Sequence, residues 1–335
     1  MKFEKSCWIR DVLTSPRRKS LPVMTSPGAA LAGYPARELF ANGDMQFESI
    51  RLLADRVPAD MQVTFMDLSV EAEAFGAGVV FSDHENPTVP NALVEDADAI
   101  DALQIPAPGA ARTAEVLRCA ERCAKELERP TLGGVIGPYS LAGRLAGMTE
   151  MMILAAAEPE TAHALLQKTA AFLKEYLLAM RATGVAGVMI AEPAAGLLSP
   201  DMCQEFAADY LRGIMDAVRT DSFMVVLHNC GRTEKQVDAL LSSGADALHV
   251  GNAVKITDII TQMPANVPLM GNLDPVGVFR NASPEDAYRL TAALLEETKE
   301  YPNFVLSSGC DLPPGVPLEN LDAYNRALQD YNNQF

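Results

Sequence analysis

Three side chains that bind transition metals follow two apolar runs of the sequence. His228 and Cys230 follow the run 223–227, and Cys310 follows the run 304–309. Short apolar runs of this kind are typical of strands buried on both faces, and side-chain alternation would point His228 and Cys230 to the same side. One imidazole and two thiolates suit zinc, and three protein ligands leave one coordination position free for a substrate. The alternative is a core histidine beside buried free cysteines.

A regular alternation of strands and helices would have to position these residues. We expect strands at 21–24, 63–68, 131–137, 185–190, 223–227, 245–250, 267–271 and 304–308. Buried-type strands that alternate with helical patterns predict an α/β fold, a (β/α)8 TIM barrel that spans residues 1–335 as a single domain. A doubly wound sheet is the main rival.

The positions of the polar residues favour the barrel over the open sheet. Polar or metal-binding side chains stand just past the expected strand ends, namely Asp67, Tyr139, Glu192, His228, Cys230, Asn252, Asn272, Asp274, Cys310 and Asp311. In a barrel these ends form one rim. In an open sheet they would spread over roughly tens of ångströms and could not meet at one metal ion.

Two segments between the expected strands need a separate interpretation. Residues 69–129 are too long for one strand-to-helix connection and contain several prolines before a helix near 111–127, so we interpret them as an insertion after the second strand that covers one end of the domain. Residues 25–33 are loop-like. Further helices are expected at 47–53, 160–180, 199–218 and 233–243, after Ser283-Pro284, and at 318–332.

Composition restricts the class of partner and the compartment. The chain of 335 residues carries a formal net charge of −17, which argues against nucleic acid or an anionic membrane as the main partner. It shows neither a signal peptide nor an apolar stretch of membrane-span length. Six scattered cysteines fit reduced thiols better than a disulfide framework, so we expect a cytoplasmic protein. Cys119 and Cys123 would share a helix face and pack in the core.

Several motifs resemble the uroporphyrinogen decarboxylase superfamily. They are HNC at 228–230, GNLDP at 271–275, SSGCDLPPG at 307–315 with PLEN at 317–320, MDLSVEAEAFG at 66–76 and GPYSLAG at 137–143. Within the superfamily they are most similar to the cobalamin-dependent methyltransferases that move a methyl group from a corrinoid protein to a thiol such as coenzyme M. The resemblance implies a barrel with Zn²⁺ bound by His228, Cys230 and Cys310. It further implies methylcobalamin carried by a corrinoid protein as methyl donor and a small-molecule thiol as acceptor, and it leaves a homodimer open.

A decarboxylase is the nearest alternative within the superfamily. Its substrate is a tetrapyrrole with many carboxylates, and decarboxylases that resemble this chain hold them with arginines in the loop after the first strand. Here that loop contains no arginine before Arg37, although the aspartate typical of decarboxylases is present as Asp67. The missing arginines favour methyl transfer.

The resemblance suggests a mechanism and roles for further residues. The acceptor thiol would bind the open position on zinc, lose its proton and attack the methyl group of methylcobalamin, with cob(I)alamin as the leaving group. Asp67 and Glu192 are the catalytic candidates. Asp67 could bind or orient the acceptor or accept its proton, and either carboxylate could complete the zinc site, although water ranks first as the fourth ligand. Asp67 could instead be a buried carboxylate bound to backbone amides, and Glu192 could merely end a strand. Tyr139 and Asn272 are expected to line the cofactor pocket.

The remaining residues leave several alternatives open. His249 is expected in the core or behind a zinc ligand. Because the chain has no D-x-H-x-x-G signature of a cobalamin-binding domain, a corrinoid would arrive on another polypeptide or as free cofactor. A corrinoid- or tetrapyrrole-binding protein without turnover would use zinc as a structural site, which needs a fourth protein ligand. A lyase or demethylase acting on a methoxylated or methylamine-type compound could use the same zinc site.

Overall fold

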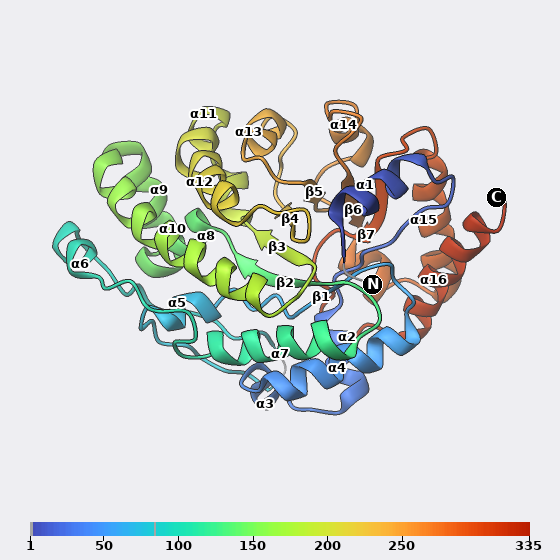
Figure 1. Cartoon of the computed structure of the whole chain (residues 1–335), viewed down its shortest axis with the longest axis horizontal. Coiled ribbons are helices and arrows are strands. Elements are labelled where there is room, and N and C mark those ends of the chain that lie inside the picture. Colours follow the sequence, from blue (N-terminus) through green and yellow to red (C-terminus); the bar gives the residue numbers. More distant parts are fainter. Residues whose placement is uncertain (1–2, 84) are drawn as a thin grey trace.

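A curled parallel sheet forms the centre of the molecule. The computed structural model describes residues 3–83 and 85–335. The sheet has seven strands in sequence order, and helices cover its outer face (Figure 1). The strands are β1 (Gln62–Val63), β2 (Thr131–Ile136), β3 (Gly187–Ala191), β4 (Met224–Asn229), β5 (Ala247–Val250), β6 (Leu269–Leu273) and β7 (Phe304–Ser308). The predicted α/β class is therefore confirmed, and the curled sheet is TIM-barrel-like.

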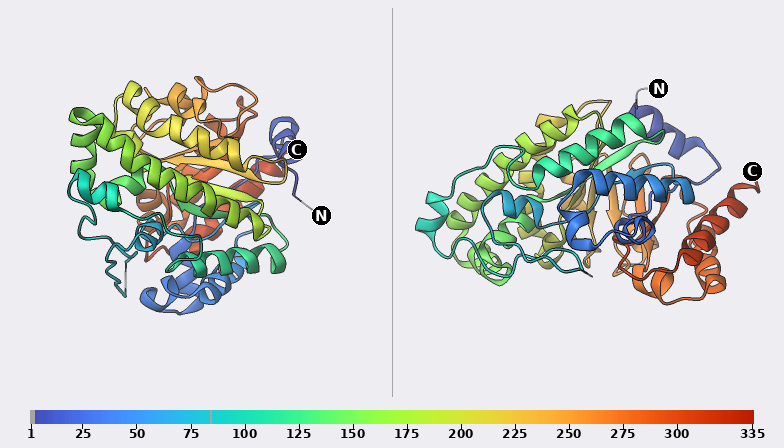
Figure 2. Two further views of the ribbon diagram at one scale, coloured as in Figure 1. Left: turned by 60° about the vertical axis from the view of Figure 1, so that its left-hand side comes forward. Right: turned by 90° about the horizontal axis from the view of Figure 1, so that it is seen from below.

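Helices occupy most of the chain between the strands. The α-helices are α1 (Lys5–Thr14), α2 (Thr25–Ala32), α3 (Ala36–Phe40), α4 (Gly43–Arg56), α5 (Val70–Ala74), α6 (Ala97–Ala102), α7 (Thr113–Glu126), α8 (Pro138–Ala146), α9 (Met148–Ala157), α10 (Pro159–Ala182), α11 (Pro200–Cys203), α12 (Asp209–Val218), α13 (Val237–Ser242), α14 (Ile256–Ile260), α15 (Pro284–Glu297) and α16 (Leu318–Asn332). A 3₁₀ turn at Pro193–Leu197 and π-helical turns at Gln204–Ala208 and Pro275–Arg280 complete the set. The last two α-helices pack side by side, in orange and red in Figure 2. No helix among the described residues is long and apolar enough to cross a membrane.

The first expected strand, 21–24, does not form a regular strand. Ser20 makes one parallel bridge to Leu306 of β7, and the Leu21 amide donates to the Leu306 carbonyl at 3.0 Å. On the other side, the Asp60 amide donates to the Ser20 carbonyl at 3.0 Å. Because Pro22 has no N–H to donate, the ladder cannot continue through it. The segment therefore lies between β7 and the residues before β1 without being a full strand.

The other strand predictions hold with small shifts, except at β1. The second expected strand, 63–68, is reduced to the two residues of β1, although the Thr64 amide still donates to the Leu132 carbonyl at 2.9 Å. By contrast, β7 has the predicted bounds, and β4 continues through His228 to Asn229. His228 is thus a strand residue, and Cys230 immediately follows the strand.

The loop expected at 25–33 is instead mainly the helix α2. Its residues include three alanines, which have the highest intrinsic helix propensity, and the helix ends at Gly33. The loop prediction gave too much weight to Pro27 and Gly28 and was wrong. The helix α2 packs against α4, the helix that precedes β1.

The segment 69–129 contains regular structure. It holds α5, α6 and α7, and the last of these packs against α4 and β2 in the manner of an ordinary outer helix. Between them, Val80 and Thr88 form a single antiparallel bridge. The description of this segment as an insertion stays a prediction.

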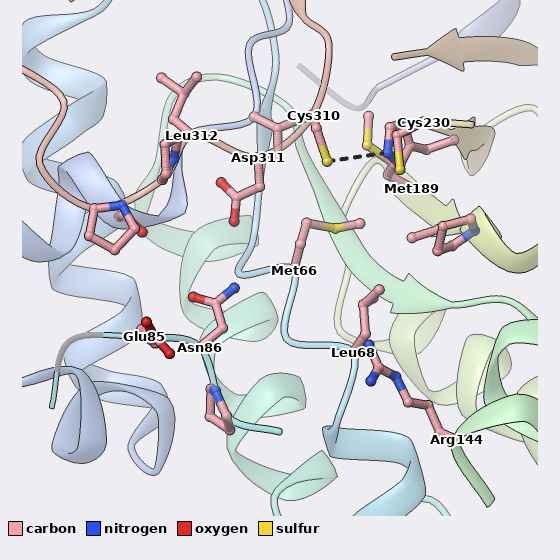
Figure 3. A pocket seen from close by; sticks show the side chains of 18 residues that line it. Met66, Leu68, Glu85, Asn86, Arg144, Met189, Cys230, Cys310, Asp311 and Leu312 are labelled. Carbon is pink, nitrogen blue, oxygen red and sulfur yellow. Dashed lines mark hydrogen bonds between the residues drawn. The ribbon is translucent and has the colours of Figure 1, made fainter. Parts of the chain in front are cut away.

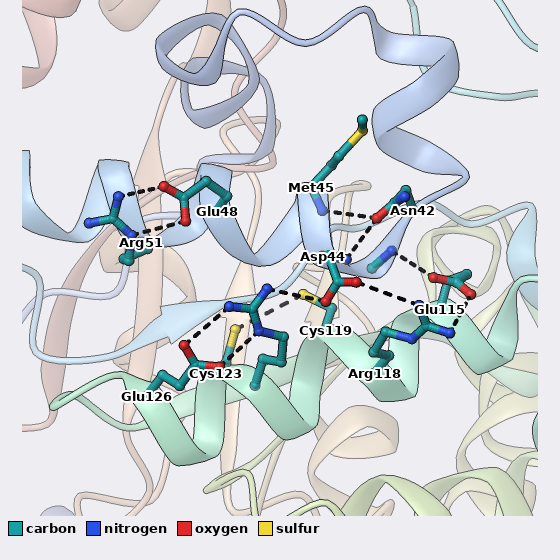
Figure 4. Close-up of polar contacts among 12 residues, drawn as sticks. Asn42, Asp44, Met45, Glu48, Arg51, Glu115, Arg118, Cys119, Cys123 and Glu126 are labelled. Carbon is teal, nitrogen blue, oxygen red and sulfur yellow. Dashed lines mark hydrogen bonds and ion pairs between the residues drawn. The ribbon is translucent and has the colours of Figure 1, made fainter.

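Contacts between α4 and α7 bury two of the cysteines (Figure 4). Asn42 caps α4 by accepting from the amides of Asp44 and Met45. Asp44 also accepts a hydrogen bond from Arg122 of α7 at 3.1 Å. Below these contacts Cys119 and Cys123 are fully buried with their sulfur atoms 4.0 Å apart. Their place in the core agrees with the predicted packing role.

Strand alternation separates an inner from an outer apolar layer. One cluster of buried side chains includes Met224 and Val226 of β4 and Ala247 of β5, whereas Val225 and Leu227 belong to the cluster that contacts the helices. Since side chains alternate along a strand, His228 and His249 continue the inner set. The sheet therefore directs both imidazoles inward at the carboxyl ends of the strands.

Close packing of β3 on β4 can be tested at Gly187. A Cβ atom there would lie 1.9 Å from the Met224 carbonyl oxygen, so Gly187→Ala forces the backbone of β3 to move. We expect the substitution to lower the free energy of unfolding by more than about 2 kcal/mol, measured by urea denaturation. Gly213→Ala in α12 is the control, because a Cβ atom there would have no neighbour within 4 Å. We expect this substitution to raise the free energy of unfolding by roughly 0.5–1 kcal/mol. Equal stability of the two variants would contradict the close approach of β3 to β4.

Candidate metal centre

The structure brings the three predicted metal ligands together at the inner rim of the sheet. His228 lies in β4, Cys230 follows that strand, and Cys310 follows β7. The nitrogen and sulfur atoms that could ligate a metal all lie within 4.8 Å of one another. The Cys310 sulfur is 3.7 Å from Nε2 of His228 (Figure 3). His228 and Cys310 are 82 positions apart in the sequence. Their donor atoms nevertheless meet, because parallel strands end at a common rim.

Close backbone packing holds Cys230 in place. The loop after β5 begins at Gly251, whose amide donates to the Asn229 carbonyl at 3.1 Å. A Cβ atom at Gly251 would lie 2.6 Å from the Cys230 Cα, so only glycine fits at this approach. On the other side, the Gly231 amide donates to the Asn229 side chain at 2.8 Å. The position of Cys230 is therefore determined by its neighbours on both sides.

The two thiols of the cluster have opposite tendencies to ionise. The contact with the Cys310 thiol, followed by the contact with the His228 ring, lowers the pKa of Cys230 to about 4, in spite of its burial. The same contact with Cys230, together with burial, raises the pKa of Cys310 well above its usual range. The pair thus shares one negative charge at neutral pH. A thiolate beside a thiol and an imidazole suits a soft divalent cation, whose charge would release the second proton.

A chain of hydrogen bonds behind His228 determines which of its nitrogens is free. Ser307 Oγ donates its only proton to the Leu21 carbonyl at 2.5 Å, so it must accept from Nε2 of His249, 2.8 Å away. Nδ1 of His249 is then unprotonated and accepts from Nδ1 of His228, 2.7 Å away. Nε2 of His228, which faces Cys310, keeps its lone pair. This is the tautomer that binds a metal.

Burial keeps the second imidazole of this chain neutral. His249 is fully buried, and desolvation, followed by the neighbouring His228, lowers its pKa well below the usual range. A neutral His249 has one donor and one acceptor, as the hydrogen-bond chain requires. His249 was predicted either in the core or behind a zinc ligand, and the structure places it in both positions at once.

A cavity of about 390 Å³ adjoins the cluster and is open at one side. Met66 and Met189 lie on the side of the cavity where the sulfur atoms are, and Leu312 adds a further apolar part of the wall (Figure 3). The remaining polar lining residues include Glu85, Asn86, Arg144 and Asp311. The volume falls within the range of about 300–1,000 Å³ that is typical of small-molecule sites.

Asp67 does not reach this cavity. Its carboxylate accepts hydrogen bonds from the Ser69 amide at 3.0 Å and hydroxyl at 2.6 Å, and it forms a buried ion pair with Arg112. Its neighbours Met66 and Leu68 line the cavity, so alternation along the chain directs Asp67 to the opposite side. The structure therefore gives Asp67 the role of a buried carboxylate bound to neighbouring groups, and its catalytic role stays a prediction.

Glu192 also lies behind the cavity wall. Its carboxylate accepts from the backbone amides of Tyr139 at 2.9 Å and Ser140 at 2.6 Å, and from the Ser140 hydroxyl. These amides open α8, so Glu192 caps the positive end of that helix. Burial raises the pKa of Glu192 to about 7, although the same hydrogen bonds act in the opposite direction. The adjacent Ala191, and not Glu192, lines the cavity.

Tyr139 and Asn272 likewise support the walls. Tyr139 is fully buried, and its hydroxyl has no hydrogen-bond partner among the described residues. Burial raises the pKa of Tyr139 to about 12. The Asn272 side chain donates to the carbonyls of Gly251 at 3.0 Å and Val254 at 2.8 Å, which fixes the loop after β5. Neither residue lines the cavity, and their cofactor-binding roles stay predictions.

Sequence reasoning missed Arg144, as well as Glu85 and Asn86, among the polar residues that line the cavity. Arg144 lies in the last turn of α8, directly after the GPYSLAG segment at 137–143. That adjacency was an available signal, since the segment itself was recognised. Arg112, the partner of Asp67, was also missed, because 45 residues separate the two in the sequence.

Comparisons with known proteins match most of the chain. The family model "Uroporphyrinogen decarboxylase (URO-D)" matches residues 16–331. The chain is 29% identical over 272 residues to "Methylcobamide:CoM methyltransferase MtbA" of Methanosarcina mazei, covering 79% of this chain and 78% of the relative. It is 28% identical over 295 residues to "Uroporphyrinogen decarboxylase" of Photobacterium profundum, covering 84% and 81%.

Solved structures show the same fold. A methyltransferase from Methanosarcina mazei superposes with a TM-score of 0.86 at 20% identity, covering 98% of this chain and 99% of the other. A B12-independent methionine synthase from a Shewanella species has a TM-score of 0.60 at 15% identity, covering 96% and 99%. At these identities the likeness concerns the fold alone.

Removing the imidazole behind His228 tests the hydrogen-bond chain. We expect His249→Phe to weaken zinc binding by about 10- to 100-fold, because His228 loses the partner that fixes its ring and tautomer. Affinity is measured by competition with a chromogenic chelator. Ser308→Ala, which changes a buried residue of β7 outside the chain of imidazoles, is the control and should retain the wild-type affinity. Unchanged affinity in a folded His249→Phe variant would refute the assigned tautomer.

The ion pair of Asp67 makes a separate prediction about stability. Arg112→Met leaves a buried carboxylate without its cation, so we expect the free energy of unfolding to fall by about 3–5 kcal/mol. Arg37→Met breaks an ion pair with Asp83 whose side chains are 63% and 61% exposed, and should cost less than about 1 kcal/mol. Urea denaturation of both variants measures the difference. If Arg112→Met lowers the free energy of unfolding no more than Arg37→Met does, the ion pair between Asp67 and Arg112 does not stabilise the fold.

Proposed function

The chain belongs to the uroporphyrinogen decarboxylase family, and on that premise we propose that it is a zinc-dependent methyltransferase. It moves a methyl group from a methylated corrinoid, carried by a partner protein, to a thiol acceptor such as coenzyme M or a related thiol. The observation that carries the proposal is the convergence of His228, Cys230 and Cys310 beside one cavity. The similarity to a methylcobamide:CoM methyltransferase supports the choice of reaction.

The chemistry of the three side chains fits zinc. Nε2 of His228 keeps a lone pair, and Cys230 ionises readily. His228, Cys230 and Cys310 would hold the ion and leave one coordination position free. Zinc bound there supplies a Lewis acid that keeps a thiol deprotonated at neutral pH.

The residues of the cavity define where the acceptor lies. Met66, Met189 and Leu312 form an apolar wall that limits water around the acceptor sulfur and preserves its reactivity. The thiol proton leaves to solvent at the open side of the cavity. The thiolate sulfur then attacks the methyl carbon in line: the carbon–sulfur bond forms, the cobalt–carbon bond breaks, and its electron pair stays with cobalt.

The lining of the cavity argues against tetrapyrrole decarboxylation. A substrate with many carboxylates calls for several guanidinium groups. Among the described lining residues, Arg144 is the only arginine or lysine, and α2, which replaces the expected first loop, contributes neither. The cavity therefore favours methyl transfer over the other activity found in the family.

Several features of the architecture belong to the same proposal. In this proposal the described residues, 3–83 and 85–335, form a single (β/α)8 barrel domain, in which the segment 21–24 takes the place of the eighth strand between β7 and β1. Residues 69–129 cap it, which is supported by Glu85 and Asn86 in the cavity lining. The corrinoid arrives on a separate polypeptide. Because the six cysteines are free, we place the reaction in the reducing cytoplasm.

Cys310→Ala tests the proposed function directly. We expect the wild type to bind about one zinc ion per chain and, with methylcobalamin and 2-mercaptoethanesulfonate, to form cob(I)alamin that is followed by absorbance. Cys310→Ala should lose zinc and methyl transfer together, because a ligand is removed. Cys7→Ala, a change in α1 away from the cavity, is the matched control and should keep both. Full transfer by metal-free protein would disprove the proposal.

A further inference from the structure

Arg144 stands on the cavity wall without a partner. Its side chain is exposed and lines the cavity (Figure 3). It forms no hydrogen bond or ion pair with any residue in 3–83 or 85–335. The contrast with Arg112 is clear, since that guanidinium is bound by Asp67, Glu73 and Ser69. The five N–H donors of Arg144 are therefore available to a ligand.

The charges around Arg144 make it the natural site for an anion. The chain carries a net charge of −17, and the same cavity is lined by the carboxylates of Glu85 and Asp311. An anionic ligand would meet a repulsive potential in such a cavity unless a cation opposed it. Arg144 supplies that cation. The planar guanidinium fork matches the oxygens of a carboxylate or sulfonate.

The cavity offers two chemically different ends. Figure 3 shows the sulfur atoms of Cys230 and Cys310 on one side of the view and Arg144 on the other, with Met66 and Leu68 between them. A ligand that matches this order has a soft sulfur atom at one end, a short apolar linker and an anionic group at the other end. The volume of about 390 Å³ suits a small molecule of this kind.

We propose that Arg144 binds the anionic tail of the acceptor, so that the acceptor is a short-chain thiol carrying a sulfonate or carboxylate group. This inference rests on the proposed function and specifies its substrate class. Arg144 acts as a specificity-determining residue: it selects the acceptor by its charge and takes no part in bond making.

The test compares acceptors that differ in charge. Wild type and Arg144→Gln, both zinc-loaded, are assayed with methylcobalamin and with 2-mercaptoethanesulfonate, 3-mercaptopropionate or the neutral 2-mercaptoethanol. Loss of a charged hydrogen bond changes affinity by about 10- to 100-fold. We expect Arg144→Gln to raise KM for the two anionic thiols by at least about 10-fold, while kcat and the KM for the neutral thiol stay unchanged. Arg144→Lys should recover part of the loss.

A binding measurement without turnover separates this inference from the proposed function. Ethanesulfonate, which has no thiol, is titrated calorimetrically into wild type, Arg144→Gln and Arg17→Gln in the absence of a methyl donor. We expect weaker binding for Arg144→Gln alone, since Arg17 lies outside the cavity lining. If wild type methylates none of the thiols, the proposed function fails, while the calorimetric difference still supports Arg144 as an anion site. Equal binding by wild type and Arg144→Gln, or an equal loss for anionic and neutral thiols, would overturn the inference.

Discussion

The hydrogen bond between the imidazoles of His228 and His249 orients the candidate site. It spans 2.7 Å between neighbouring strands, in a place where both rings are buried. Because Ser307 can only accept from His249, the polarity of the bond is fixed, and the free lone pair of His228 faces Cys310. The register of β4 against β5, which places His228 opposite His249, is thus a condition for metal binding as well as for folding. A shift of one residue would turn both rings to the opposite face.

The carboxylates behind the cavity wall show how the fold supports the site. Glu192 binds the first amides of α8, and the last turn of that helix carries Arg144. Asp67 binds Arg112 and so connects the chain after β1 with the residue that precedes α7. Both carboxylates follow strand ends, as catalytic groups do in barrels. Their side chains nevertheless point away from the cavity, because they stand at alternate positions to the lining residues.

The family includes relatives with two different activities, and the fold does not distinguish between them. The distinction lies in the side chains of one cavity: two thiols and an imidazole at one end, a single guanidinium at the other. A soft donor set suits a metal ion such as zinc, which would bind a thiol acceptor. A tetrapyrrole with many carboxylates would need more positive charge than one arginine provides. The proposed reaction therefore depends on the chemical character of the cavity more than on overall similarity.

The sequence by itself determined the alternation of buried strands with helices and the donor set of His228, Cys230 and Cys310. Apolar runs and strand-end residues are local patterns, and parallel strands must bring their ends to one rim. Only the tertiary structure decided that Pro22 would prevent a first full strand, that the chain after it would form α2, and that Asp67 and Glu192 would turn outward. It also decided that His249 would fix the tautomer of His228 and that Arg144 would face the cavity unpaired. These features depend on contacts between residues far apart in the chain, such as Asp67 with Arg112 and Ser307 with Leu21, and spacing along a single sequence does not specify such contacts.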